Sequence, residues 1–154
     1  DDSNMEMYRQ LLQASRKVFQ TASRENVAVV CTYQLALYAK DKRFLDATCL
    51  SNSKQIKEVF SEMLYMRPLW EDEYTGERYD CRAYTRGKNS DGSWEKFTTP
   101  VTLDKTKKYI VAFLDKTRND EDNQQFLYEV DFTWNRWREI GYCKIRDDHI
   151  ALAR

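Results

Sequence analysis

The chain has very little of what enzymes usually need. Its only histidine, His149, lies close to the C-terminus, so the commonest general base and metal ligand is missing from almost the whole chain. Glycine-rich phosphate loops, GxSxG elbows and HExxH helices do not occur. Pairs of acids such as Glu71 with Asp72 lie in polar loops, where we expect solvated turns. The sequence therefore predicts a protein that is not an enzyme and that needs no cofactor or metal.

An excess of either charge is also missing. The 25 basic and 25 acidic residues balance to a formal net charge of zero, so no global field attracts nucleic acid or an anionic membrane. No apolar run approaches the roughly 18 residues of a membrane span, and the sequence contains no basic-then-apolar signal-peptide pattern. We expect a single soluble domain over residues 1–154, a monomer with neither nucleic-acid nor membrane partners.

Four cysteines are spread widely along the chain without a CxxC pair, which makes a zinc site a poor expectation. An even number at wide spacing favours two disulfides in an oxidising compartment over buried free thiols. Three connectivities are possible among Cys31, Cys49, Cys81 and Cys143, and the spacing does not choose between them.

The hydrophobic pattern changes its period after the first two dozen residues. Residues 5–22 repeat apolar side chains at spacings of three and four, which predicts an amphipathic helix. After that the period is two, and β-branched and aromatic residues dominate. Expected strands cover residues 27–39, 44–50, 56–66, 78–86, 94–102, 108–114, 125–134 and 139–145.

Polar turn segments separate these strands, and the chain has only four glycines and two prolines. The pattern predicts a mainly β fold in which an N-terminal helix precedes a meander of strands closed into an antiparallel barrel. Two alternatives remain open: a cystatin-like sheet wrapped on a helix, and a helix in place of the strand at 56–66, where the apolar residues also fit a helical stripe.

Aromatic residues make up 14% of the chain, with four Trp, ten Tyr and seven Phe. Tyrosine and tryptophan combine a large apolar body with a polar tip, which suits a cavity that grips a ring and hydrogen-bonds its substituents. We expect at least half of these aromatic residues to fill the strands and the interface between helix and barrel instead.

The stretch from Tyr38 to Cys49 is informative. Tyr38, Asp41 and Phe44 follow one another at spacings of three and lead into Cys49. This resembles the first hairpin of the tick salivary lipocalins that bind histamine and serotonin, in which a YxxDxxW element precedes a strand ending in FTC. Phe44 stands where that family usually has tryptophan.

A second resemblance lies late in the chain. Residues 109–111, 128–132 and Cys143 are similar in order and spacing to the CD[VIL]…EL[WY]…C pattern of the same family. Tyr109 stands in place of the family's cysteine, and Asp131 in place of its Trp or Tyr. Ile110 stands in place of the family's aspartate, so these departures remove one expected disulfide partner and one expected carboxylate.

The resemblance implies a lipocalin-like eight-stranded antiparallel barrel with an N-terminal helix and a ligand cavity inside. It also implies a protein secreted in saliva that sequesters a host amine, serotonin or histamine, in that cavity. It implies ligand-binding roles for the six residues that match or replace the family's positions. Asp41 and Glu129 would pair with the ammonium group of the ligand, with Tyr38 and Phe44 among the rings around it. Tyr109 and Asp131 complete the expected site. Which amine is preferred, and whether one or two sites exist, stays open.

Two other functions remain possible. A lipocalin for a lipid mediator, an eicosanoid or fatty acid, would need an inward cation such as Arg78, Arg82 or Arg136. A protein inhibitor would use the loops at 71–76 and 87–92 without any cavity ligand. Periodicity also leaves open which face of the strand at 125–134 is inward: its aromatic phase, or the phase that carries Glu129.

Overall fold

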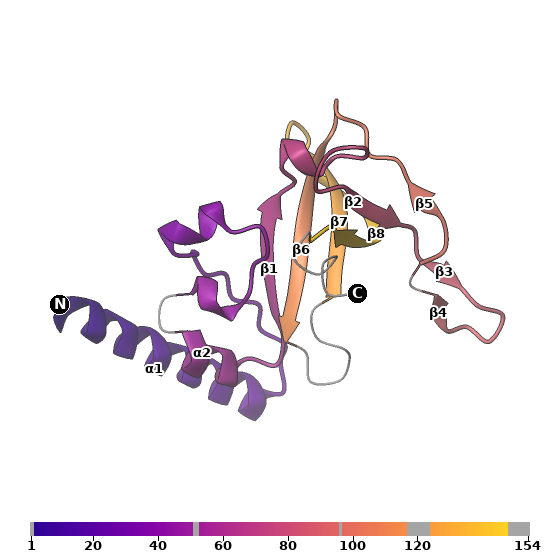
Figure 1. The fold of residues 1–154 in the computed structure, drawn as a ribbon. Helices are drawn as coiled ribbons and strands as arrows, with labels where there is room; N and C mark the ends of the chain where they lie inside the picture. Colours follow the sequence, from indigo (N-terminus) through magenta and orange to yellow (C-terminus); the bar gives the residue numbers. More distant parts are fainter. Residues whose placement is uncertain (1, 51–52, 96, 117–123, 148–154) are drawn as a thin grey trace. The chain divides into compact units, whose positions relative to one another are not determined.

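The computed structural model describes residues 2–50, 53–95, 97–116 and 124–147. His149 lies outside the described residues. The chain divides into two compact units (Figure 1). The first runs up to Leu64 and includes Asp115; the second comprises Tyr65–Leu114 and the described residues from Gln124 on. Each unit is described by itself.

The first unit is built on helix α1 (Asp2–Glu25), which confirms the helix expected at residues 5–22 and extends it at both ends. The helix ends before Asn26, whose φ of 52° lies in the left-handed region that stops a helix. A short second helix, α2 (Ser53–Val59), packs on α1 with Ile56 fully buried. Ser15 of α1 is also buried, and its Oγ donates to the Leu11 carbonyl at 2.8 Å.

The prediction of strands at residues 27–39 and 44–50 is wrong. All of these residues are described, and they form irregular chain with two 3-10 turns, η1 (Leu37–Asp41) and η2 (Ala47–Cys49). Val30 is almost fully exposed despite its β-branched neighbours. High β propensity makes a strand only where a neighbouring strand supplies hydrogen bonds and packing, and this segment has no such neighbour among the described residues.

The segment at residues 56–66 combines the two alternatives. Its first part belongs to α2, which ends at Val59, and its last part begins strand β1 (Met63–Pro68). The expectation of one continuous strand is therefore wrong, because the helical stripe prevails up to Val59 and alternating burial starts only at Met63.

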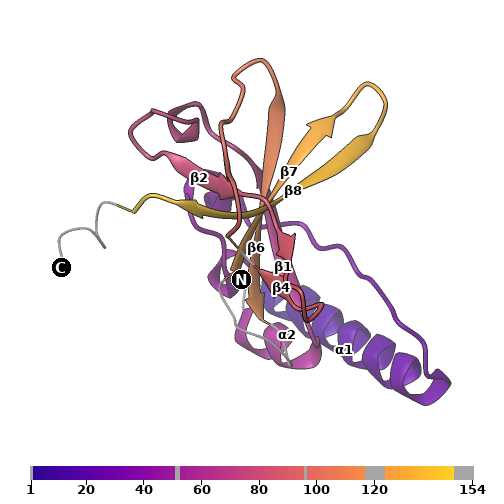
Figure 2. The same cartoon turned by 90° about the vertical axis from the view of Figure 1, so that its right-hand side faces the viewer.

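The second unit contains most of an antiparallel six-stranded sheet in the order β1-β6-β7-β8-β2-β5 (Figures 1 and 2). Its other strands are β2 (Cys81–Tyr84), β5 (Pro100–Val101), β6 (Lys108–Lys116), β7 (Gln124–Asp131) and β8 (Arg136–Ile145). A separate ribbon pairs β3 (Gly87–Lys88) with β4 (Trp94–Glu95), and a 3-10 turn, η3 (Glu71–Glu73), follows β1. The mainly β antiparallel class is confirmed. The sheet of the described residues has β1 and β5 as its two edges, so a closed barrel of eight strands is not confirmed.

Strand β6 is the centre of the core. Its residues Ile110, Val111, Ala112 and Phe113 are all buried, although successive residues point to opposite faces of the sheet. A strand covered on both faces needs a continuous apolar run instead of alternation. Across the sheet, Val111 stands opposite Leu127 of β7, and neither side chain is exposed.

Candidate functional site

Three of the six expected site residues belong to the first unit. Tyr38 lies in η1 and is exposed, with its hydroxyl donating to the Thr48 carbonyl. Lys42 Nζ lies 5.6 Å from the centroid of the Tyr38 ring. Asp41, at the end of the same turn, is exposed, and Phe44 is half-buried. The expected turn between residues 39 and 43 thus exists, but it joins irregular segments instead of two strands.

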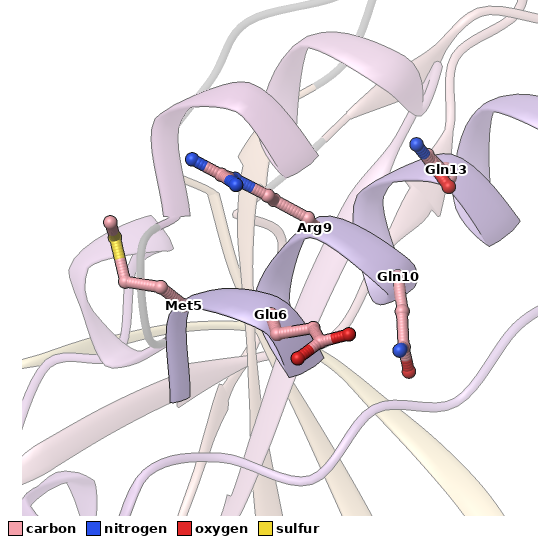
Figure 3. Close-up of a pocket in the computed structure, with 5 residues that line it drawn as sticks. All are labelled: Met5, Glu6, Arg9, Gln10 and Gln13. Carbon is pink, nitrogen blue, oxygen red and sulfur yellow. The ribbon is translucent and has the colours of Figure 1, made fainter. Parts of the chain in front are cut away.

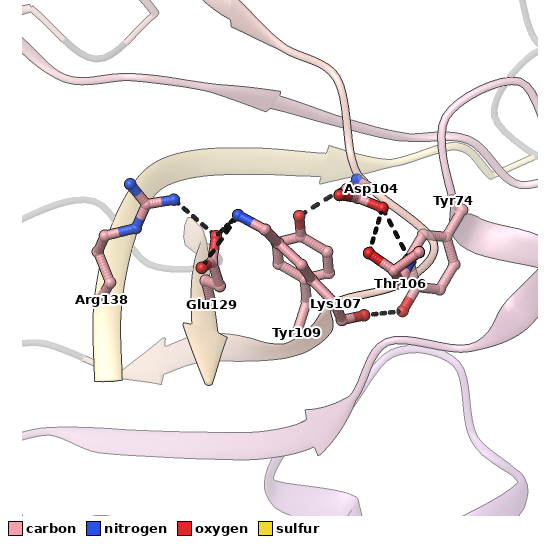
Figure 4. Close-up of polar contacts among 7 residues, drawn as sticks. All are labelled: Tyr74, Asp104, Thr106, Lys107, Tyr109, Glu129 and Arg138. Atoms are coloured by element: carbon pink, nitrogen blue, oxygen red, sulfur yellow. Dashed lines mark hydrogen bonds and ion pairs between the residues drawn. The ribbon is translucent and has the colours of Figure 1, made fainter. Parts of the chain in front are cut away.

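The other three, Tyr109, Glu129 and Asp131, belong to the second unit. Tyr109 and Glu129 are directly opposed on β6 and β7, so their side chains share one face of the sheet. The Tyr109 ring is buried and packs edge-on against Tyr74, with ring centroids 6.0 Å apart. Its hydroxyl accepts a hydrogen bond from the Asp104 amide at 3.2 Å (Figure 4).

Glu129 carries two cations on its carboxylate (Figure 4). Arg138 Nη2 lies 2.6 Å from Glu129 Oε2, and Lys107 Nζ lies 3.1 Å from the same oxygen. The Glu129 side chain is 24% exposed. Partial desolvation acts to raise the pKa of Glu129, but the hydrogen bonds and charges of Arg138 and Lys107 outweigh it and lower the pKa below its ordinary value of 4.5. At neutral pH this group is therefore a carboxylate.

Sequence reasoning missed both partners of Glu129. Arg138 stands opposite Glu129 in the β7–β8 register. The length of the hairpin turn, residues 132–135, sets this register, so the pair could have been predicted from the sequence if the turn length had been known. Lys107 precedes β6 in a turn that Asp104 caps by accepting from the Thr106 amide at 2.9 Å. No pattern in the sequence singles out Lys107 from the neighbouring lysines.

The register also shows which residues share a face with Glu129. That face carries the fully buried Leu127, whereas Phe126 and Tyr128 point to the other face. The aromatic side has its own packing, since the rings of Phe126 and Tyr142 lie 4.9 Å apart. Side chains therefore pack on both faces of β7. The alternation in the sequence predicts one face of this strand to be inward and the other to face solvent.

Asp131 has a local role. It is exposed at the end of β7, and its Oδ1 accepts from the amide of Thr133 at 2.9 Å. This is the geometry of an aspartate that caps a turn through its own backbone two residues on. Asp131 therefore holds the turn of the β7–β8 hairpin, whatever else it binds.

All four cysteines are free thiols in this structure, so the two expected disulfides are not formed in it. Cys81 and Cys143 are neighbours on adjacent strands, because Cys143 stands opposite Ala83 and Cys81 opposite Ile145. The hydrogen bond with Cys81, and then burial, raise the pKa of Cys143 well above the ordinary value of 9.0. A protonated, buried thiol of this kind is a poor nucleophile.

A surface hollow occurs on helix α1 (Figure 3). It is lined by Met5, Glu6, Arg9, Gln10 and Gln13. All five belong to one helix, and none of them is an expected ligand-binding residue.

Within the described ranges, no three His, Cys, Asp or Glu side chains gather in a way that could hold a metal ion. None of the described helices combines the length and the apolarity that crossing a membrane requires. Comparison of the chain with protein-family models, curated proteins and solved structures gives no match.

Proposed function

We propose that this protein binds and sequesters a small biogenic amine, serotonin or histamine, as a secreted protein similar to the amine-binding lipocalins of tick saliva. The observation that carries the proposal is the carboxylate of Glu129, which is kept ionised beside the buried ring of Tyr109. A biogenic amine offers one ammonium and one aromatic ring, and this pair of residues offers a partner for each.

The two cations on Glu129 define how an amine would bind. Lys107 Nζ contacts both carboxylate oxygens, at 3.1 and 3.3 Å, and is itself partly exposed. An incoming ammonium has the same charge and the same donors as Lys107, so it replaces Lys107 without leaving the carboxylate unpaired. Arg138 stays in place and holds the carboxylate in position.

Asp41, Tyr38 and Phe44 form a second candidate group in the first unit. Asp41 is an exposed carboxylate without an ion-pair partner among the described residues, and Tyr38 lies in the same turn. The resemblance to the amine-binding family supports a role for these three residues, because Tyr38 and Asp41 match the family's first motif and Phe44 stands at its tryptophan position.

One observation favours a second candidate, a lipid mediator with a carboxylate. Lys107 and Arg138 bring two positive charges to the single negative charge of Glu129, so the cluster as a whole is cationic. An anionic ligand would bind these cations, and its affinity would rise if the negative charge of Glu129 were removed. The affinity of an amine would fall with the same change. The same substitution therefore separates the two candidates.

Isothermal titration calorimetry with serotonin, histamine and arachidonate tests the proposal. A charge-assisted hydrogen bond contributes about 1.5–3 kcal/mol, so Glu129→Gln should weaken amine binding by about tenfold to a hundredfold. Glu77→Gln is the matched control, because Glu77 is also a carboxylate paired with an exposed lysine of the same unit, Lys105. Asp41→Asn and Phe44→Ala test the first unit in the same way.

Amine binding that none of these variants changes would show that the site lies elsewhere. Binding of arachidonate alone, tightened by Glu129→Gln, would assign the protein to lipid mediators. If the parent protein binds none of the three compounds, the proposal is wrong, and a protein partner that uses the loops at 71–76 and 87–92 becomes the better hypothesis.

A further inference from the structure

The tip of the β7–β8 hairpin carries three exposed aromatic side chains within six residues. Phe132, Trp134 and Trp137 are 65%, 70% and 48% exposed. The turn at residues 132–135 lies beyond the last register pair of the two strands, Asp131 with Arg136. Figure 2 shows this hairpin extending outward from the sheet of the second unit. Large aromatic side chains gathered at an exposed site indicate a surface that binds something.

Among the described residues, the aromatic side chains at the tip have few contacts. Trp137 packs edge-on against Tyr128, with ring centroids 6.2 Å apart, and its indole Nε1 donates to Asn135 Oδ1 at 3.4 Å. Asn135 has a φ of 48°, a conformation that Asn tolerates better than most residues and that closes the turn tightly. A tight turn displays Phe132 and Trp134 on a convex end of the hairpin.

The charges around this tip are mostly positive. The hairpin from Glu129 to Arg138 and the adjoining Lys107 and Lys108 contain four cations and two carboxylates, a local excess of two positive charges. Both carboxylates have partners nearby: Glu129 pairs with Lys107 and Arg138, and Asp131 accepts from the Thr133 amide. Within the part of the chain that the structure describes, Lys108 and Arg136 are exposed and make no ion pair.

We propose that the tip of the β7–β8 hairpin is a docking surface for the headgroup layer of an anionic phospholipid bilayer. Trp134 enters the interfacial layer, where an indole that combines an apolar body with a polar N–H is most stable, and the apolar ring of Phe132 is buried beside it. Arg136 and Lys108 contact the lipid phosphate and carboxylate groups from the two sides of the hairpin.

A lipid surface fits this tip better than a folded partner does. A protein partner would need a pocket shaped for a convex turn, whereas a headgroup layer admits separate side chains without a matching shape. The balanced charge of the whole chain led us to expect no membrane partner. That balance does not apply locally, because surface charges act on a membrane within about a Debye length, roughly 8–10 Å.

Sedimentation with large vesicles of phosphatidylcholine, with and without phosphatidylserine, tests the inference on the full chain. We expect binding to the phosphatidylserine vesicles that weakens as salt is raised. The double variant Phe132→Ser/Trp134→Ser should lose about tenfold or more in partitioning. Lys108→Gln and Arg136→Gln should each weaken partitioning onto the anionic vesicles by about fivefold.

Trp94→Ser is the matched control, because Trp94 is also exposed, at 54%, but lies on the β3–β4 ribbon. It should bind vesicles as the parent does. Far-UV circular dichroism checks that each variant is folded. A second measurement needs no loss of fold: lipids brominated on the acyl chain should quench the parent's tryptophan emission, and Trp134→Phe should lose most of that quenching.

Three results would overturn the proposal. The first is failure of the parent protein to sediment with phosphatidylserine vesicles at low salt. The second is binding of the double variant that is as tight as that of the parent and of the Trp94→Ser control. Binding to a single-stranded oligonucleotide without binding to vesicles would assign the aromatic and basic tip to nucleic acid instead. None of these results depends on whether the protein binds an amine.

Discussion

Arg67 and Glu73 form a bidentate ion pair inside the second unit. Arg67 Nη2 lies 2.6 Å from Glu73 Oε1, and Arg67 Nη1 lies 2.7 Å from Glu73 Oε2. The two side chains are only 7% and 0% exposed. Trp70 completes the arrangement, because its amide donates to Glu73 at 2.8 Å and its ring lies 4.5 Å from the Arg67 guanidinium. The pair joins strand β1 to the 3-10 turn η3.

Substituting one partner of this pair should lower the free energy of unfolding more than substituting both. Arg67→Met leaves the Glu73 carboxylate buried without its cation, so the free energy of unfolding should fall by about 3–5 kcal/mol. The double variant Arg67→Met/Glu73→Leu should recover much of that loss, since no charge stays buried. Urea unfolding followed by tryptophan emission measures both. Arg24→Met breaks the exposed pair with Glu25 and should change the free energy of unfolding by less than about 1 kcal/mol.

Stability should depend on Glu129 in a defined pH range. Its pKa in the folded protein is lowered below 4.5, so its ion pairs stabilise the fold above that value, and the contribution disappears as pH falls through the lower folded pKa. Thermal unfolding of the parent and of Glu129→Gln should therefore differ at neutral pH and converge in acid. High salt should shrink the difference, because the group is partly exposed. Glu6→Gln, on the exposed face of α1, is the charge-deletion control.

Thiol reactivity should follow burial in the reduced protein. Cys31 is half-buried, whereas Cys49, Cys81 and Cys143 are buried, and the pKa of Cys143 is raised. Iodoacetamide should therefore modify Cys31 first and Cys143 only when the protein unfolds. Peptide mass spectrometry over a time course identifies the order. Rapid modification of Cys143 in the folded protein would contradict this description of its surroundings.

The same chemistry tests the two disulfides expected from the sequence. Titration in denaturant without a reductant should find almost no free thiol in protein from an oxidising compartment. Four reactive thiols would show that the expectation is wrong. If bridges do form, we expect Cys81 with Cys143, since these two thiols already contact each other.

Gly141 should not tolerate a side chain. Its φ is +142°, and a Cβ at this position would lie 2.2 Å from the Tyr84 carbonyl oxygen on the neighbouring strand. Gly141→Ala should therefore force the β2–β8 pair apart and lower the melting temperature strongly. Gly92→Ala is the control, because its φ of +84° is also left-handed but nothing lies within 4 Å of the new Cβ. The Gly92→Ala substitution should lower the free energy of unfolding by only about 1–2 kcal/mol.

Several elements of this fold follow from the sequence by itself. The spacing of three and four at residues 5–22 is enough to predict helix α1. A helix with a single apolar stripe can pack that stripe on any apolar surface, so the prediction does not depend on which segment it packs against. The long apolar run of β6 and the alternation in β7 likewise predict strands, and the structure places each of them between two other strands of the sheet. For α1 and β6 the local pattern and the packing agree, whereas β7 forms the expected strand but packs on both of its faces.

Tertiary structure alone decided the rest. Residues 27–39 have the composition of a strand, but the described part of the chain offers no adjacent strand to bond with, and an isolated strand has no stability of its own. At the candidate site, the resemblance to the amine-binding family identified Glu129 as a carboxylate worth testing. Only the register of β7 with β8 brought Arg138 to it, and only the turn before β6 brought Lys107. The periodicity of a strand fixes which residues share a face, whereas the charges that meet on that face depend on pairing between distant segments.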